Sequence, residues 1–283
     1  MNPQKTLGQL DETIRNFIRE LDIAASDRNA RIYEAVLVLA GRLKTRRNGT
    51  IVASAENLKV VEAIKKEISA LIADSAYAAT ASGIDAGFMR LAGTLDLYFV
   101  SVVDSYRQNA ELAKAIRQAN VRTTIESLLG SGVDANFTQP LAKLLRQHVA
   151  GNATVKDLTA ALRLELLENA NAVPRLNRYA GQVASDALQQ FERNYTSAVS
   201  YDLKLEHFLY SGTGIADTRD FCRTRTGKVF TRQQVEGWAA LEWAGRIKGT
   251  NKSNIFTYLG GYFCRHRLLP VSETVYEKLK NPA

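Results

Sequence analysis

Residues that could do chemistry gather in one late stretch of the chain, residues 205–272. This stretch holds both cysteines, both tryptophans and two of the three histidines. A protein zinc site needs about four thiolate, imidazole or carboxylate donors in a tetrahedral array. The candidate metal ligands are therefore Cys222, Cys264, His266 and His207, with zinc as the ion that they would suit.

Another interpretation of the cysteines stays open. Zinc sites are commonly built on a C-x-x-C chelating pair, but Cys222 has no second cysteine three residues later. Cys264 and His266 are only two residues apart, so their side chains would point to opposite sides of an extended segment. The two thiols could instead be small buried groups in contact with each other, with His266 orienting a loop.

Acidic and basic side chains in the same stretch raise a catalytic alternative. A metal-dependent or histidine-based nuclease site could form from Asp217, Arg219, Asp220, His207 and His266, because phosphodiester cleavage needs a positioned base and a cation near the developing charge. Their spacing matches no P-loop, nucleophile elbow or zinc-hydrolase motif. The two aspartates could equally supply the fourth metal ligand or pair with neighbouring arginines. We expect no catalytic residues, and a structural role for both aspartates.

Glycines and aromatic residues predict how this stretch is folded. Gly260 and Gly261 allow a backbone turn that other residues resist, and Trp238 and Trp243 supply large apolar bodies to hold it. A turn and short strand over 227–231 precede a segment with helical apolar spacing over 232–243. These features predict a small α+β domain over residues 205–283, which we call the C-terminal module.

The C-terminal module also carries most of the net charge. The chain has a formal charge of +8 and a pI near 9.4, and residues 211–270 hold ten basic side chains against four acidic ones. Such a face is either an ordinary solvated surface or a contact surface for nucleic acid or an acidic partner. The candidate contact residues are Arg219, Arg223, Arg225, Lys228, Arg265 and Arg267.

The chain before this module has helical periodicity throughout. Apolar residues at three- and four-residue spacing predict one helix ending near Ala25 and a second capped by Ser26-Asp27, followed by further helices. Gly130-Ser131-Gly132 predicts a flexible joint, and Pro174 predicts the start of a new helix. The predicted organisation is a helical region (1–173), a connecting helix (174–204) and the C-terminal module, so the fold class is mainly α with a small α+β domain.

Several classes of protein are excluded by composition. The longest apolar runs are too short and too interrupted by aspartates for a membrane span, and the first residues lack the apolar core of a secretory signal. Two cysteines do not make a disulfide framework. We expect a non-secreted protein with no membrane partner.

Four motifs in the last third of the chain occur in a recognisable order. They are Asp217-Thr218-Arg219-Asp220-Phe221-Cys222, Gly227-Lys228-Val229-Phe230, Gly260-Gly261-Tyr262-Phe263-Cys264-Arg265-His266 and Pro270-Val271-Ser272. Together with the helical run before them, 178–193, they resemble the C-terminal domain of phage head morphogenesis proteins, the minor head proteins of the phage Mu F type. Many members of that family carry a C-x-x-C pair at the first motif, and this chain does not.

The resemblance implies a role in viral assembly. It implies a minor capsid protein that associates with the portal protein and other head or neck proteins, at the portal vertex or in the capsid interior. Such a protein would belong to a multi-copy assembly, lie next to packaged double-stranded DNA, and pass through the host cytoplasm before it enters the virion. A phage-encoded nuclease or toxin-like enzyme is the alternative, since small domains appended to head proteins of this type can resemble nuclease toxins.

Overall fold

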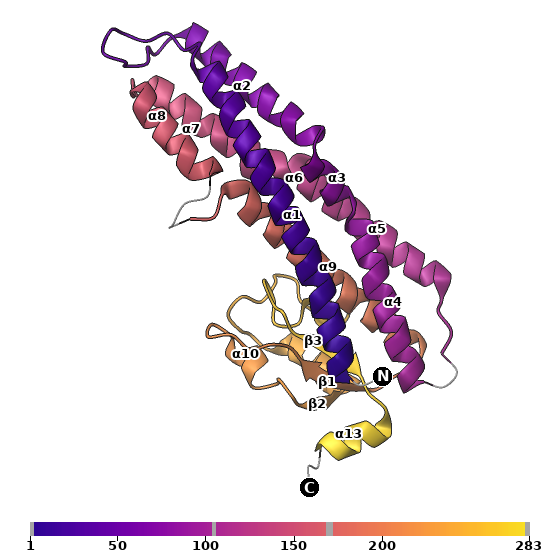
Figure 1. Cartoon of the computed structure of the whole chain (residues 1–283). Helices are drawn as coiled ribbons and strands as arrows, with labels where there is room; N and C mark the ends of the chain where they lie inside the picture. The colour runs from indigo at the N-terminus through magenta and orange to yellow at the C-terminus, as the bar shows by residue number, and fades with distance from the viewer. Residues whose placement is uncertain (1–2, 104–105, 168–171, 281–283) are drawn as a thin grey trace. The chain divides into compact units, whose positions relative to one another are not determined.

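The computed structural model describes residues 3–103, 106–167 and 172–280 (Figure 1). The described residues are mainly helical, with one three-stranded antiparallel sheet near the C-terminus, which confirms the predicted fold class. They form two compact units, each assembled from separated segments: a first unit of residues 1–15, 85–120 and 186–283, and a second unit of residues 16–84 and 121–185. Within the described ranges, no helix combines the length and the apolar character that a membrane span requires.

In its described residues, the second unit has helices and isolated bridges as its regular secondary structure. It contains α2 (Ala55–Ala73), α3 (Ala76–Ser82), α6 (Ser131–Val133), η1 (Asp134–Thr138), α7 (Gln139–Ala150) and α8 (Val155–Leu166), with parts of α1 (Pro3–Ala40), α5 (Ala110–Leu129) and α9 (Arg175–Asp202). Local sequence sets the helix starts: the Ser54 hydroxyl accepts from the Asn57 N–H, and Thr154 and Asp157 form a capping box at α8. Helices α2 and α7 pack together along buried aliphatic side chains.

The prediction of two helices at the start of the chain was wrong. Residues Pro3–Ala40 form one continuous helix, α1, and Ser26-Asp27 lies inside it. The side chains expected to cap a new helix have other partners: the Ser26 hydroxyl accepts from Asn177 Nδ2 at 2.8 Å, and Asp27 pairs with Arg31 at 3.0 Å. A polar residue inside a helix does not end it when its side chain is satisfied elsewhere.

The glycines at 130–132 do mark a helix end. Helix α5 spans Ala110–Leu129, and the chain then turns through Gly130 into α6. Gly132 is needed for close packing here, because a Cβ atom at this residue would lie 2.5 Å from the Ser127 carbonyl oxygen and 2.6 Å from the Tyr179 hydroxyl. The break therefore arises from a tight approach between chain segments.

The first unit contains the sheet. Strand β1 (His207–Ser211) is central, with β2 (Val229–Thr231) on one side and β3 (Arg267–Pro270) on the other. The register pairs Phe208 with both Phe230 and Pro270. The other elements are parts of α1, α5 and α9, together with α4 (Ile84–Val102), α10 (Asp220–Arg223), α11 (Arg232–Gly237), η2 (Trp238–Ala240), α12 (Ile255–Tyr258) and α13 (Glu273–Lys280).

Aromatic side chains make the core of the C-terminal module. Trp238 is buried and meets Phe230 edge to face with ring centroids 4.9 Å apart, while Trp243 stacks on Phe221 at 4.2 Å. The predicted strand over 227–231 is present as β2, and the predicted helix over 232–243 ends earlier, at Ala240. Trp243 lies in the following loop, where its Nε1 donates to the Gly260 carbonyl at 3.0 Å.

Candidate metal centre

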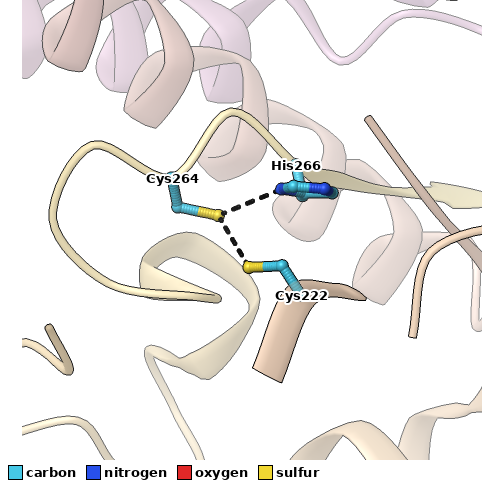
Figure 2. Close-up of side chains that lie close together, drawn as sticks. All are labelled: Cys222, Cys264 and His266. Atoms are coloured by element: carbon cyan, nitrogen blue, oxygen red, sulfur yellow. Dashed lines mark hydrogen bonds between the residues drawn. The ribbon is translucent and has the colours of Figure 1, made fainter. Parts of the chain in front are cut away.

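Three metal-ligating side chains converge in the interior of the C-terminal module. Cys222 comes from α10, and Cys264 and His266 come from the segment that leads into β3. Dashed lines in Figure 2 join Cys264 to both of the others, and its Sγ lies 3.8 Å from Cys222 Sγ and 3.9 Å from His266 Nδ1. All three residues are buried, and one ligand atom of each lies within 4.8 Å of the others. This group could hold a metal ion.

Two glycines make the convergence possible. A side chain at Gly260 would collide with the sulfur of Cys222, and one at Gly261 would collide with the Gly245 carbonyl oxygen. Gly261 also has a φ of 92°, a conformation that favours glycine. The pair thus lets the chain turn directly against both thiols, in the place where the sequence predicted a turn.

Arg193, which the sequence did not single out, holds the ligand segment from α9. Its Nε donates to the His266 carbonyl at 3.0 Å, its Nη1 donates to the Thr257 carbonyl at 3.1 Å, and its Nη2 donates to the Cys264 carbonyl. A planar guanidinium presents its donors on three separate nitrogen atoms in a rigid fork and can therefore reach carbonyl groups that lie apart, whereas the donors of a lysine are all on one nitrogen. Nothing in the local pattern of a helical arginine indicates that its partners lie more than 60 residues away.

Tyr210 is a second residue that sequence reasoning missed. It projects from the central strand β1, where its hydroxyl donates to Cys222 Sγ at 3.2 Å and its ring stacks on His266 at 5.4 Å. Burial raises the pKa of this phenol, so Tyr210 remains a neutral donor. Its alternation with Phe208 on the buried face of β1 predicts burial, but it does not predict the contact with sulfur.

The two thiols are electrostatically unequal. A hydrogen bond from Cys222 lowers the pKa of Cys264, and the nearby Arg193 guanidinium and His266 add to this effect while burial opposes it. The same hydrogen bond raises the pKa of Cys222, and burial raises it further. Of the pair, Cys264 is therefore the readier thiolate, which is the form that binds metals.

A small cavity borders the group. It has a volume of about 50 Å³, and all three ligand residues line it together with Asp217, Thr218 and Arg219. His266 Nε2 is buried and has no hydrogen-bond partner within the described ranges. Among the residues whose placement is described, no fourth histidine, cysteine or carboxylate joins the group. The centre thus has three protein donors and an adjacent opening.

His207, predicted as the fourth ligand, lies elsewhere. Its Nδ1 is 3.0 Å from Glu273 Oε2, and its ring stacks on Tyr276 with centroids 4.0 Å apart. Both partners belong to α13, so His207 ties this helix to β1. The prediction failed because residues that share one stretch of sequence need not face one another in the folded chain.

The candidate acid and base residues do not share one environment. His266 is buried against Tyr210, and His207 is occupied by Glu273. Asp220 has an 88% exposed side chain and lies 3.5 Å from Arg223, an exposed pair of small energetic consequence. Asp217 is exposed and lines the small cavity.

The candidate basic contact residues divide into three exposed, two half-buried and one buried. Arg223, Lys228 and Arg265 are exposed. Arg219 is half-buried and donates to the Tyr262 carbonyl at 2.7 Å. Arg225 is half-buried over the Phe221 and Trp238 rings, at 4.0 and 4.7 Å, where burial lowers its pKa. These last two therefore support the module as well as contributing charge.

Arg267 corrects the prediction of a contact residue. It is only 3% exposed, its Nε lies 2.9 Å from Glu192 Oε2, and its Nη2 donates to Asp11 Oδ1 at 2.8 Å. Glu192 is itself buried. Burying a guanidinium is tolerated when carboxylates compensate its charge, so Arg267 has a structural role inside the first unit.

Comparison with known proteins gives no match: no protein-family model fits the chain, and neither curated proteins nor solved structures show a relative. The likeness to phage head morphogenesis proteins therefore remains a prediction from the sequence motifs.

Proposed function

We propose that this chain is a non-catalytic structural protein of a phage head, bound at the portal vertex or inside the capsid and next to packaged DNA. The observation that carries the proposal is the mutual packing of the first and third of the four motifs that resemble this family. Arg219 of the first motif (217–222) donates to the Tyr262 carbonyl of the third (260–266) at 2.7 Å, and Cys222 of the first lies 3.8 Å from Cys264 of the third.

This packing supports a binding role better than a catalytic one. Residues of the first and third motifs join α10 to the segment before β3. Of the four side chains with acid–base capacity, His266 is buried, His207 and Asp220 are paired, and Asp217 is exposed. Three of the six candidate contact residues, Arg223, Lys228 and Arg265, are exposed to solvent. Exposed cations of this kind suit phosphate contacts that carry no sequence information.

The proposal is tested in the assembled particle. Deleting the gene, or replacing it with one truncated before Leu205, is expected to reduce the number of DNA-filled heads, and a reconstruction of wild-type particles is expected to show density for the module against the portal or inner shell. Particles of normal number, composition and genome content after deletion would overturn the proposal.

Zinc is the metal that we propose for the centre. Tetrahedral zinc with thiolate bonds of about 2.3 Å separates two sulfurs by roughly 3.8 Å, and the two Sγ atoms lie 3.8 Å apart. Two thiols and an imidazole are donors of the kind that zinc takes. Cys222, Cys264 and His266 would hold the ion, and the ion would supply a cross-link between α10 and the segment before β3. The cavity lined by Asp217 leaves room for a fourth ligand.

A further inference from the structure

We propose that Cys222 and Cys264 are an oxidation site: in the metal-free protein, a small peroxide converts them into an intramolecular disulfide that locks the C-terminal module. The same two thiols then have two alternative states, metal-bound and cross-linked. This inference concerns the thiols alone and does not depend on the role in a phage head.

The geometry already brings the sulfurs into contact. Both thiols are free, and their Sγ atoms are 3.8 Å apart. A disulfide bond measures about 2.0 Å, so the sulfurs must approach by roughly 1.8 Å. A side chain at residue 260 would occupy the space beside Cys222 Sγ and Cys264 Sγ, and because this residue is glycine, that space stays open. The chain has no third cysteine, so no other bridge within one molecule competes.

Access to the sulfurs is restricted by size. Both cysteines line the cavity of about 50 Å³, and they are otherwise only 2% and 5% exposed. This volume counts the space open to the centre of a water-sized sphere, and about 10–15 Å³ of it is enough to hold one water molecule. The cavity therefore admits a molecule as small as hydrogen peroxide but not a peptide disulfide such as oxidised glutathione. The site is therefore expected to distinguish between these two oxidants.

The chemistry balances with peroxide as the only oxidant. One thiolate sulfur attacks a peroxide oxygen, the O–O bond breaks, and a sulfenic acid and hydroxide form. The second thiol then attacks the sulfenic sulfur, an S–S bond forms, and hydroxide leaves. The two protons lost by the thiols and the two hydroxides make two molecules of water, while the two sulfurs together lose two electrons.

The cross-link would join elements that are distant in the chain. The two cysteines are 42 residues apart, and the bond would fasten α10 to the segment before β3. Closing a loop of this length restricts the unfolded chain, so the melting temperature is expected to rise by about 5 °C.

The experiment uses the purified full chain, reduced, freed of metal with a chelator and treated with hydrogen peroxide. Intact mass under denaturing conditions should fall by 2 Da, thiols open to alkylation should fall from two to none, and digestion should yield one peptide pair joined through Cys222 and Cys264. Oxidised glutathione at the same concentration should react at least tenfold more slowly. Two alkylatable thiols after peroxide, cross-links between molecules only, or equal rates with both oxidants would overturn the proposal.

Two controls separate this inference from the zinc proposal. Cys222→Ser leaves one thiol, so peroxide should add oxygen to Cys264 and yield no 2 Da loss. Protein preloaded with zinc should form the disulfide at least tenfold more slowly than the metal-free protein. If zinc fails to bind, the metal-free reaction still decides whether the disulfide forms.

Discussion

Arg193 and His266 are joined by a hydrogen bond of 3.0 Å from the Arg193 Nε to the His266 carbonyl oxygen. The same guanidinium donates to the carbonyls of Thr257 and Cys264, so one side chain of α9 holds three points of the segment that carries two metal ligands. The candidate metal centre is therefore positioned from outside the C-terminal module as well as from within it.

Arg193→Lys should lower the free energy of unfolding by about 3 kcal/mol, because the single nitrogen of a lysine cannot reach the positions that Nε, Nη1 and Nη2 of the guanidinium occupy, so buried acceptors lose their partners. Chemical denaturation measures this loss. Arg223→Lys is the matched control, since its side chain is 64% exposed, and it should change stability by less than about 0.5 kcal/mol. Equal losses of unfolding free energy in the two variants would mean that the Arg193 hydrogen bonds stabilise the protein no more than an exposed arginine does.

Metal binding should depend on Cys222, Cys264 and His266 but not on His207. Cys264→Ser and His266→Ala should each reduce bound zinc from about one ion per chain to less than a tenth of that, measured by elemental analysis after dialysis. His207→Ala should retain the wild-type zinc content, because that side chain faces Glu273 and Tyr276. Bound zinc should also fall as pH is lowered below about 6, because protons compete for the thiolates and the imidazole. Zinc content that is unaffected by Cys264→Ser would remove the proposed centre.

Gly261→Ala should be among the most damaging single substitutions in the module. The residue has a φ of 92°, and a Cβ atom would collide with the Gly245 carbonyl oxygen. A loss of about 3 kcal/mol or more, or insoluble protein, is expected. Gly237→Ala is the control, because this glycine lies at the end of α11 with a φ of −62° and no neighbouring atom within 4 Å. Its unfolding transition should stay within about 1 kcal/mol of wild type.

Arg267→Met should destabilise the first unit by about 3–5 kcal/mol, because it leaves the buried Glu192 without its main counter-charge. Arg265→Met, two residues earlier and exposed, should leave stability almost unchanged. Thermal and denaturant unfolding of both variants measures the contrast. Comparable loss in both would contradict a structural role that is particular to Arg267.

The Arg267→Met penalty should depend on pH. Burial raises the pKa of Glu192 in the folded protein above its unfolded value, an effect that Arg267 opposes. A carboxyl whose folded pKa is raised favours folding at low pH, and this contribution is lost as pH rises through the folded pKa. Removing Arg267 raises the folded pKa of Glu192 further. The difference in free energy of unfolding between wild type and variant should therefore become smaller as the pH is lowered from about 8 to about 5. A gap that is constant over this range would exclude titration of Glu192 as its cause.

DNA binding should follow the exposed cations alone. The triple substitution Arg223→Glu, Lys228→Glu and Arg265→Glu should weaken binding to duplex DNA at least tenfold and reduce the slope of log affinity against log salt by about two to three. Fluorescence anisotropy over a salt series measures both quantities. The control is Arg246→Gln, which removes a positive charge inside the module. Arg246 donates to the Ala239 and Thr250 carbonyls, so this substitution should leave the slope of log affinity against log salt close to the wild-type value. Affinity that is independent of salt would exclude a phosphate surface here.

The sequence determined the fold class and the location of the candidate centre. Apolar spacing indicated helices before residue 205, and Ser54 and Thr154 cap α2 and α8 as such residues do at helix starts. The cluster of rare residues in 205–272 pointed to Cys222, Cys264 and His266, and the glycine pair pointed to the turn beside them. Helix caps, apolar spacing and the glycine turn are local features, so the residues that cause them lie close together in the chain, whereas the cysteines and His266 were indicated by their rarity.

Only the tertiary structure decided which side chains meet. It excluded His207 from the centre, placed Arg267 in a buried ion pair, and brought Arg193 and Tyr210 to the ligands. It also joined two expected helices into α1, since Ser26 bonds to Asn177. A periodic pattern indicates which side of a helix or strand is buried. The partner of a buried polar group depends instead on how elements that are distant in the sequence pack together, and no local sequence pattern predicts that packing.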